Sequence, residues 1–354
     1  MRVLFFKRMG SIIVFFFGVL LWSANHFGTA HAQTYQPYAN LFENHSFSKE
    51  GKTLPYRLMK PKGFDASKRY PLHIALHGAP ERGTNNEQQV STTSLCVAPW
   101  AVDSERTVRP AFVLAPQCPP DQEWVALHWS DCGAKLPPAA SMAWPGRFVL
   151  DLIDSLCREF PSIDTTRIYL SGGSMGGVGT WYLCQYRPDR FAAAFPVTGA
   201  GDTTLPMSFV NNIPVWTFAG SLDDVVPVSA TRSMIAAIRR AGGDPHYNEI
   251  TGEGHTNALI GGAAANPEVH AWLFSQTKRS TTVEFHTIPS NRHVDKSAVF
   301  VSIAGFRNAS GSISGVTRIN DLMGRIILPN ESRGRQQGRS RTAILVNIKN
   351  VPKQ

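Results

Sequence analysis

The sequence lacks the short motifs that hold most metal ions and nucleotides in proteins. It contains no C-x-x-C pair, no H-E-x-x-H and no glycine-rich phosphate loop followed by a lysine. Long apolar runs are equally scarce, because the one at residues 11–22 falls short of the roughly 20 residues that span a bilayer. We therefore expect no metal site, no cofactor and no stable membrane span in the mature chain.

The apolar run at residues 11–22 belongs to a targeting segment. Three basic residues lie in the first eight positions, and a small-x-small pattern follows the run at Ala30-His31-Ala32. These are the parts of a secretory signal peptide. We expect residues 1–32 to be removed after Ala32, so that the protein is secreted or periplasmic. An uncleaved membrane anchor is the alternative.

The net charge of +9 is distributed unevenly along the chain. Residues 33–277 carry 19 Lys and Arg against 22 Asp and Glu, whereas residues 278–354 carry 13 against 4. The basic excess therefore lies in the targeting segment and the tail, and it gives no information on the substrate of the main region. For an exported protein, we expect no nucleic-acid partner.

The sequence divides into three parts, which are a signal peptide at residues 1–32, a catalytic domain at 33–277 and a basic tail at 278–354. Loops rich in Ser, Gly and Arg separate the β-like runs of the tail, which are residues 299–304, 326–328 and 342–348. The most basic stretch, residues 332–341, has the composition of a disordered segment. The tail is therefore either a small β module or a disordered extension.

The chain has only five cysteines. Cys96, Cys118 and Cys132 lie in loop-like sequence, and an exported protein can form a disulfide among them, although the pairing stays open. Cys157 and Cys184 lie in helix-like patterns and are expected to be buried as small apolar residues. The odd count leaves at least one thiol free.

Strand-like and helix-like stretches alternate through residues 42–276. Expected strands are residues 42–47, 53–59, 70–77, 112–116, 192–197, 214–219 and 247–250, together with one that leads into Gly172. Expected helices are residues 148–160, the segment from 178 to 186, 230–241 and 267–276. This alternation predicts an α/β fold with a mostly parallel sheet covered by helices on both faces. The first two strands are expected to form an antiparallel hairpin.

The strand before Gly172 leads into the pattern G-x-S-x-G at Gly172-Gly173-Ser174-Met175-Gly176. This is the pattern of a nucleophile elbow, in which a tight strand-to-helix turn exposes a serine hydroxyl. Small flanking residues are needed because side chains there would collide with the neighbouring strand or helix. An ordinary glycine-rich turn is the alternative, but a strand precedes this one and an amphipathic segment follows. We predict that Ser174 is a nucleophile.

A serine nucleophile needs a base within hydrogen-bond distance and an acid that orients the base. On folds with this elbow the chain order is Ser, Asp, His, so both partners should follow residue 174. His255 comes directly after the last core strand, with glycines on its N-terminal side. The other later histidines begin a strand, lie inside a helix or come after the core; these are His246, His270, His286 and His293. We predict that His255 is the base.

The candidate acid follows the strand at residues 214–219. Two adjacent aspartates, Asp223 and Asp224, come after that strand, and only one of them can face His255. We predict Asp223, with Asp224 as a loop carboxylate. Asp202, which follows the preceding strand, is a second alternative.

The oxyanion that forms during attack needs two backbone N–H donors. We predict Met175, directly after the nucleophile, and Ala79, in the loop that follows His77-Gly78 at the end of a buried strand. His77 itself is expected to hold the loop backbone. Glu81 and Arg82 are expected to form an ion pair that braces this loop.

Residues 79–145 interrupt the alternation of strands and helices, and four tryptophans lie there: Trp100, Trp124, Trp129 and Trp144. Long loops above such a sheet often build a substrate pocket. Each of these tryptophans either packs the loop onto the core or contacts substrate. Trp181, on the helix after the elbow, is expected in the core.

Three motifs resemble those of a known family. They are the segment from Leu76-His77-Gly78-Ala79-Pro80-Glu81-Arg82-Gly83 to Glu87, Ala115-Pro116-Gln117-Cys118-Pro119 and Gly173-Ser174-Met175-Gly176-Gly177. Residues 40–277 thus resemble a bacterial esterase and predicted-peptidase group of the α/β-hydrolase superfamily, similar to phospholipase/carboxylesterases and polyhydroxybutyrate-depolymerase-like esterases. The resemblance implies a triad of Ser174, Asp223 and His255. Pro80 stands where the family usually has glycine. Because proline has a fixed φ, it stiffens the loop that supplies the Ala79 donor.

These observations predict a secreted or periplasmic serine hydrolase that cleaves carboxylic esters through an acyl-enzyme. The substrate is expected to be a small-molecule or carbohydrate-linked ester. A serine peptidase is the first alternative, since the resemblance permits one. A non-catalytic binding protein on the same fold is the second, although the complete and correctly ordered triad argues against it. The acyl group, the leaving group and the oligomeric state are left open.

Overall fold

The structure, a computed structural model, describes residues 38–91, 96–206 and 208–278, and residues 282–287, 299–304 and 344–347 beyond them. The expected signal peptide, the tail run at residues 326–328 and the basic stretch at residues 332–341 lie outside these ranges. The chain divides into two compact units, residues 1–278 and residues 279–354. Each unit has its own sheet.

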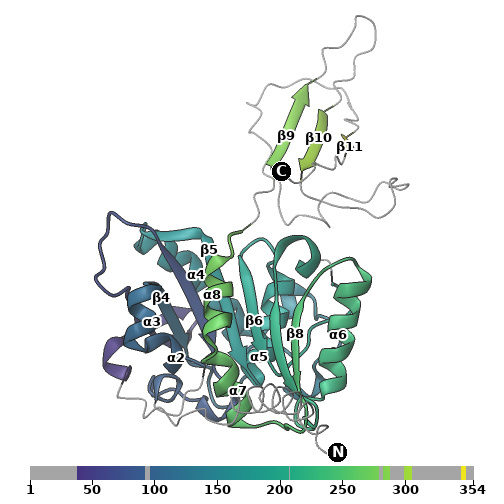
Figure 1. Cartoon of the computed structure of the whole chain (residues 1–354). Coiled ribbons are helices and arrows are strands. Elements are labelled where there is room, and N and C mark those ends of the chain that lie inside the picture. Colours follow the sequence, from purple (N-terminus) through teal and green to yellow (C-terminus); the bar gives the residue numbers. More distant parts are fainter. Residues whose placement is uncertain are drawn as a thin grey trace, which may run out of the picture. The chain divides into compact units, whose positions relative to one another are not determined.

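The first unit contains an eight-stranded sheet in the order β1-β2-β4-β3-β5-β6-β7-β8 (Figure 1). Its strands are β1 (Glu43–Lys49), β2 (Lys52–Met59), β3 (Tyr70–Leu76), β4 (Phe112–Pro116), β5 (Ile163–Gly173), β6 (Ala193–Val197), β7 (Trp216–Gly220) and β8 (His246–Ile250). β1 and β2 form an antiparallel hairpin, and β2 is also antiparallel to β4. All other neighbours are parallel. The predicted fold class is therefore confirmed.

Helices cover both faces of this sheet. They are α2 (Ala98–Ala101), α3 (Asp103–Val108), α4 (Trp144–Glu159), α5 (Met175–Tyr186), α6 (Val228–Arg240), α7 (Asn257–Ala264) and α8 (Pro267–Ser275). α8 crosses one face and α5 lies behind the other (Figure 1). No helix in the described ranges combines the length and the apolarity that crossing a membrane requires.

The alternation of side chains along β5 explains why two cores form. Ile168 and Leu170 point into a core shared with α4, α5 and α6, whereas Tyr169 points into a second core shared with α2, α7 and α8. Successive side chains of a strand face opposite sides of a sheet, so a strand covered on both faces is apolar throughout. The sheet between the two cores sets the positions of the loops at its carboxyl edge.

Several helices differ from the sequence prediction. α2 and α3 lie within residues 79–145, which the sequence predicts to be loop-like, and α5 begins three residues before its predicted start. α4 begins at Trp144, four residues before the predicted start, with Pro145 in its first turn, where the missing N–H costs nothing. α7 was not predicted, because its sequence, NALIGGAA, contains two adjacent glycines that lower helix propensity. Its first turn is capped by the Thr256 hydroxyl, which accepts the N–H of Leu259 at 3.1 Å.

The sequence permits a disulfide among the loop cysteines, but all five cysteines are free thiols in the structure. Cys96 belongs to the core shared with α2, α7 and α8, whereas Cys118 and Cys132 belong to the core on the other face. Burial raises the pKa of the Cys132 thiol to about 11, which keeps it protonated. Cys184 is buried as expected, and Cys157 is only partly buried.

The second unit contains a three-stranded sheet in the order β11-β10-β9. Its strands are β9 (Thr282–Thr287), β10 (Val299–Ala304) and β11 (Ile344–Asn347). β9 and β10 are antiparallel, and β10 and β11 are parallel. β10 has the bounds of a predicted run and β11 lies within another, but β9 was not predicted.

Candidate active site

The turn between β5 and α5 holds Ser174 in a rare conformation. Its φ is 57° and its ψ is −125°, which few residues other than glycine adopt. The chain passes so close to β3 here that a Cβ atom on Gly176 would collide with the carbonyl of Leu76 and lie 2.8 Å from that of His77. Glycine is therefore required at this position, and the turn presents the serine hydroxyl at the edge of the sheet.

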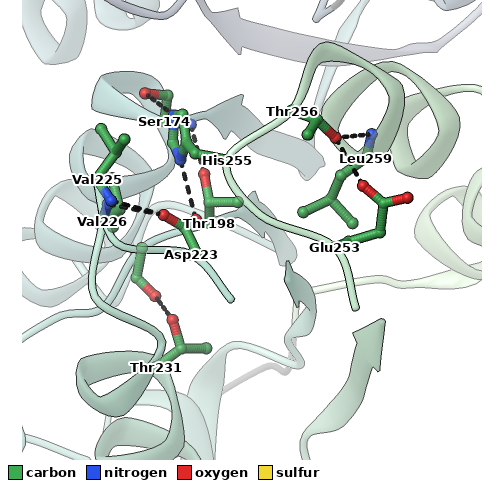
Figure 2. A network of polar contacts seen from close by, with 11 residues as sticks. Ser174, Thr198, Asp223, Val225, Val226, Thr231, Glu253, His255, Thr256 and Leu259 are labelled. Atoms are coloured by element: carbon green, nitrogen blue, oxygen red, sulfur yellow. Dashed lines mark hydrogen bonds and ion pairs between the residues drawn. The ribbon is translucent and has the colours of Figure 1, made fainter. Parts of the chain in front are cut away.

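The structure brings together the three residues predicted as a triad (Figure 2). His255 Nε2 lies 2.8 Å from Ser174 Oγ, and His255 Nδ1 lies 2.9 Å from Asp223 Oδ2. A carboxylate can only accept a hydrogen bond, so His255 carries its proton on Nδ1. Nε2 is then free of a proton and accepts the hydrogen bond of the Ser174 hydroxyl.

Asp223 is buried, and main-chain groups fix its carboxylate. Oδ1 accepts the N–H groups of Val225 at 3.1 Å and of Val226 at 2.9 Å, while Oδ2 faces His255. The Asp223 side chain has no solvent exposure and that of His255 has 15%. These main-chain donors keep the carboxylate in place, so it holds the imidazole in one orientation.

The alternative acids lie elsewhere. Asp224 is exposed on the same loop. Asp202 is buried, but its carboxylate accepts the N–H groups of Leu136 at 2.7 Å and of Thr204 at 2.8 Å. Asp202 therefore ties the loop after β6 to the segment that precedes α4, and it is not a partner of His255.

The loops that carry Asp223 and His255 are joined by their main chains. The N–H of Leu222 donates to the carbonyl of Glu253 at 2.8 Å. A Cβ atom on Gly220 would collide with that same carbonyl and lie 2.7 Å from the carbonyl of Gly254. The close approach of the two loops therefore depends on glycine at position 220.

The two predicted oxyanion donors, Met175 and Ala79, both adjoin the nucleophile. Met175 is the first residue of α5, where N–H groups have no partner within the helix. Ala79 begins a short 3-10 turn, Ala79–Glu81. A Cβ atom built on the preceding Gly78 would lie 3.6 Å from Ser174 Cβ, so the Ala79 peptide adjoins the nucleophile.

His77 anchors the loop after β3, which carries Ala79 and is here called the oxyanion loop. Its Nδ1 donates to the carbonyl of Gly78 at 2.6 Å, and its Nε2 accepts the N–H of Cys118 at 2.9 Å. The carbonyl of His77 accepts the indole N–H of Trp124 at 3.0 Å. Complete burial lowers the pKa of His77 to about 4, so the ring is neutral and can serve as donor and acceptor at once.

Gln117 also holds this loop, and sequence reasoning missed its role. Its Nε2 donates to the carbonyl of Glu81 at 3.2 Å and to Asn85 Oδ1 at 2.9 Å, and its Oε1 accepts the N–H of Asn86 at 2.6 Å. Gln117 is completely buried. One feature of the sequence pointed to this role: Gln117 directly follows the buried strand β4, and β4 pairs in parallel with β3, so the two strands end beside each other.

The expected ion pair between Glu81 and Arg82 is replaced by other contacts in the described structure. Arg82 Nε donates to the carbonyl of Ala79 at 3.2 Å, and the guanidinium lies 5.4 Å from the centre of the Trp129 ring. Burial raises the pKa of the Glu81 carboxyl. Arg82 thus braces the loop through its backbone and through an aromatic ring.

The tryptophans of residues 79–145 mainly pack the segment onto the core. Trp100 and Trp124 are buried, as is Trp181 on α5. Trp144 packs edge-on against Phe148, and Trp129 packs against His128; both tryptophans are partly buried. Within the described ranges, no cluster of three or more His, Cys, Asp or Glu side chains suited to a metal ion is present.

Comparisons with known proteins identify chains with a similar fold and sequence. The structure of a thermostable esterase is 35% identical, with a TM-score of 0.62, over 68% of this chain and 64% of that chain. A bifunctional acetylxylan esterase/xylanase of Neocallimastix patriciarum is 34% identical over 85 residues, 23% of this chain. An uncharacterized secreted protein of Arthroderma benhamiae is 29% identical over 115 residues, 24% of this chain. No protein-family profile matches.

The matches to the two curated relatives cover only 12% of each of those proteins. The chain thus spans about an eighth of their length and less than two thirds of the thermostable esterase. The similarity shows the fold and leaves the activity to be argued from the site.

Proposed function

We propose that this chain, which has the α/β-hydrolase fold, is a serine hydrolase that cleaves carboxylic esters through an acyl-enzyme. The observation that carries the proposal is the continuous hydrogen-bonded path from Ser174 through His255 to Asp223. Such a path supplies what a serine nucleophile needs, namely a base within hydrogen-bond distance and an oriented imidazole. The similarity to a thermostable esterase supports the same conclusion.

In the proposed reaction Ser174 Oγ attacks the ester carbonyl carbon, and its proton passes to His255 Nε2. The carbonyl oxygen becomes an oxyanion, which accepts hydrogen bonds from the N–H groups of Met175 and Ala79. The C–O bond to the alcohol then breaks, and the imidazolium returns its proton to the departing oxygen. Water, activated by His255, attacks the acyl-enzyme and releases the acid and Ser174.

The role of Asp223 follows from its burial and its contacts. The carboxylate keeps the Nδ1–H tautomer of His255 in place and stabilises the imidazolium that forms when Ser174 loses its proton. Its two main-chain donors, from Val225 and Val226, prevent it from rotating away during the reaction. The site therefore provides orientation and charge stabilisation without a cofactor.

The proposed substrate is a small-molecule or carbohydrate-linked ester. The similarity to an acetylxylan esterase/xylanase favours the carbohydrate-linked class. The similarity to a secreted protein favours export through the signal peptide proposed for residues 1–32. The mature chain would then begin at Gln33.

The test compares purified residues 33–354 with Ser174→Ala on three substrate classes, which are p-nitrophenyl esters, acetylated and feruloylated sugars, and peptide anilides. We expect ester cleavage by the wild type and a loss on the order of 10⁴-fold in kcat in the variant. Preferential cleavage of anilides would indicate a peptidase. Wild-type activity in Ser174→Ala would refute the assignment of the nucleophile.

A further inference from the structure

A second strained residue lies directly beneath the nucleophile. Thr198, the first residue after β6, has a φ of 50°. Positive φ is rare outside glycine and rarer still for a β-branched side chain, whose Cβ crowds the backbone. Among the described residues other than glycine, Ser174 and Thr198 are two of four with positive φ, and these two contact each other.

The contact is a hydrogen bond to the backbone of the nucleophile. The N–H of Ser174 donates to Thr198 Oγ1 and to the carbonyl of Val197, each at 3.0 Å. Figure 2 shows the Thr198 side chain below the turn, on the side away from the Ser174 hydroxyl. Thr198 is 1% exposed, so water does not compete for this hydrogen bond.

Three parts of the fold fix the Thr198 backbone, and its hydroxyl with it. Its N–H donates to the carbonyl of Phe218 in β7 at 2.8 Å. Its own carbonyl lies so close to α5 that a Cβ atom on Gly177 would be 2.5 Å away. The carbonyl of the next residue, Gly199, accepts the Thr231 hydroxyl of α6 at 2.7 Å. The strained conformation is thus imposed by contacts on several sides.

We propose that Thr198 is a positioning residue, whose hydroxyl holds the backbone N–H of Ser174 and thereby sets the direction of the Ser174 side chain. The Ser174 N–H is held at two points, the carbonyl of Val197 and the Thr198 hydroxyl, and both contacts resist relaxation of a turn whose φ is 57°. Without it, Ser174 Oγ would move relative to His255 Nε2, which now lies at 2.8 Å. Small displacements of this kind reduce rate far more than binding. This inference rests on the proposed function of Ser174.

Three substitutions separate positioning from simple packing. Thr198→Val keeps the volume and the branched Cβ but removes the hydroxyl. Thr198→Ser keeps the hydroxyl and removes only a methyl group. Thr198→Gly also lacks the hydroxyl, and it folds without strain at positive φ, so it serves if the valine variant does not fold.

The experiment measures kcat and KM on a p-nitrophenyl ester for all four proteins, together with their melting temperatures. We expect kcat to fall on the order of 10²-fold in Thr198→Val and Thr198→Gly, with KM within about twofold. Thr198→Ser should keep kcat within about threefold of the wild type, although it packs less well. A packing role predicts the reverse order, with valine the better replacement.

Wild-type kcat in a folded Thr198→Val or Thr198→Gly would overturn the proposal, as would equal losses in the serine and valine variants. Failure of the proposed function looks different: the wild type itself would neither cleave esters nor react with a fluorophosphonate, and this inference would be lost with it.

Discussion

The two sides of Ser174 are held in place by different kinds of contact. On the oxyanion side, buried side chains fasten the loop after β3, mainly His77 and Gln117. On the acid and base side, main chains fasten the loops after β7 and β8 to each other, and a glycine at position 220 permits their approach. Activity should therefore be sensitive to the loss of polar side-chain atoms on the oxyanion side, and to the addition of a side-chain atom on the acid and base side.

The lengths of the connections explain this difference. The loop after β3 belongs to a long connection, in which some backbone groups, such as the N–H of Asn86, are buried and bind a side chain. The loops after β7 and β8 are short and lie side by side, so each main chain can satisfy the other. The geometry of the site therefore depends on buried polar side chains on one side of Ser174 and on glycine at a close main-chain contact on the other. Four substitutions, two of them with a matched control, test this difference between the two sides.

The largest effect is expected from Gly220→Ala. Its Cβ atom would push against the carbonyls of Glu253 and Gly254 and separate the loop that carries Asp223 from the loop that carries His255. We expect kcat to fall on the order of 10²-fold and the free energy of unfolding to fall by about 1–3 kcal/mol. Ester kinetics and urea denaturation measure the two effects.

Gly262→Ala is the matched control for that substitution. It lies in α7, where a Cβ atom would meet nothing within 4 Å. Alanine should therefore leave kcat unchanged and stabilise the helix by about 0.5–1 kcal/mol. Equal activity in the two alanine variants would show that the contact at position 220 does not matter for catalysis.

The next effect is expected from Gln117→Leu. It leaves the buried N–H of Asn86 and the carbonyl of Glu81 without the partner they have now, and should cost about 1–3 kcal/mol of stability. Because Ala79 lies on the same loop, kcat should also fall, by about tenfold or more. Urea denaturation and ester kinetics would measure both losses.

Gln185→Leu provides the control, since Gln185 is also buried and makes comparable hydrogen bonds to the backbone of Asp202. It should lose similar stability and keep kcat. If both variants kept kcat, the oxyanion loop would not depend on side-chain anchors.

A smaller effect is expected in the pH dependence of stability. Burial lowers the pKa of His77 to about 4, from 6.5. The folded protein thus binds fewer protons than the unfolded chain between these values, so stability is present above pH 6.5 and is lost as the pH falls through 4. As the pH falls through this range, the unfolding free energy of His77→Gln should therefore decrease by about 3 kcal/mol less than that of the wild type. Parallel curves of unfolding free energy against pH for the two proteins would contradict this account.

The smallest effect, of opposite sign, is expected from Glu81→Gln. Burial raises the pKa of the Glu81 carboxyl above 4.5. The folded protein then binds more protons than the unfolded chain, so the stability that this group contributes is lost as the pH rises through its folded pKa. The unfolding free energy of Glu81→Gln should therefore rise relative to that of the wild type as the pH increases from 4 to 8. Urea denaturation at both pH values tests this, and a gain toward low pH would refute it.

The strands and the grouping of Ser174, Asp223 and His255 could be predicted from sequence because both depend on repeating patterns. Strands buried on both faces appear as apolar runs, and β4 has the predicted bounds. The three polar residues each follow such a run, and parallel strands end at the same edge of a sheet. Together with the chain order of folds that carry a nucleophile elbow, this was enough to select residues 174, 223 and 255.

The supports of the site could not be predicted in the same way. Gln117 and Thr198 are single polar residues next to apolar runs, and neither spacing nor composition distinguishes them from ordinary strand ends. Their partners lie far away in sequence, as with Gln117 and Asn86, which are separated by 31 positions. Such contacts depend on the exact path of the loops. In the same way, the sheet separates Cys96 from Cys118 and Cys132, so Cys96 cannot form a disulfide with either of them.

Mass spectrometry after fluorophosphonate labelling tests most directly whether Ser174 is a nucleophile activated by His255. We predict a single adduct on the peptide that contains Ser174, its absence in Ser174→Ala and much slower labelling in His255→Ala. An adduct on another residue, or unchanged labelling in Ser174→Ala, would contradict the account.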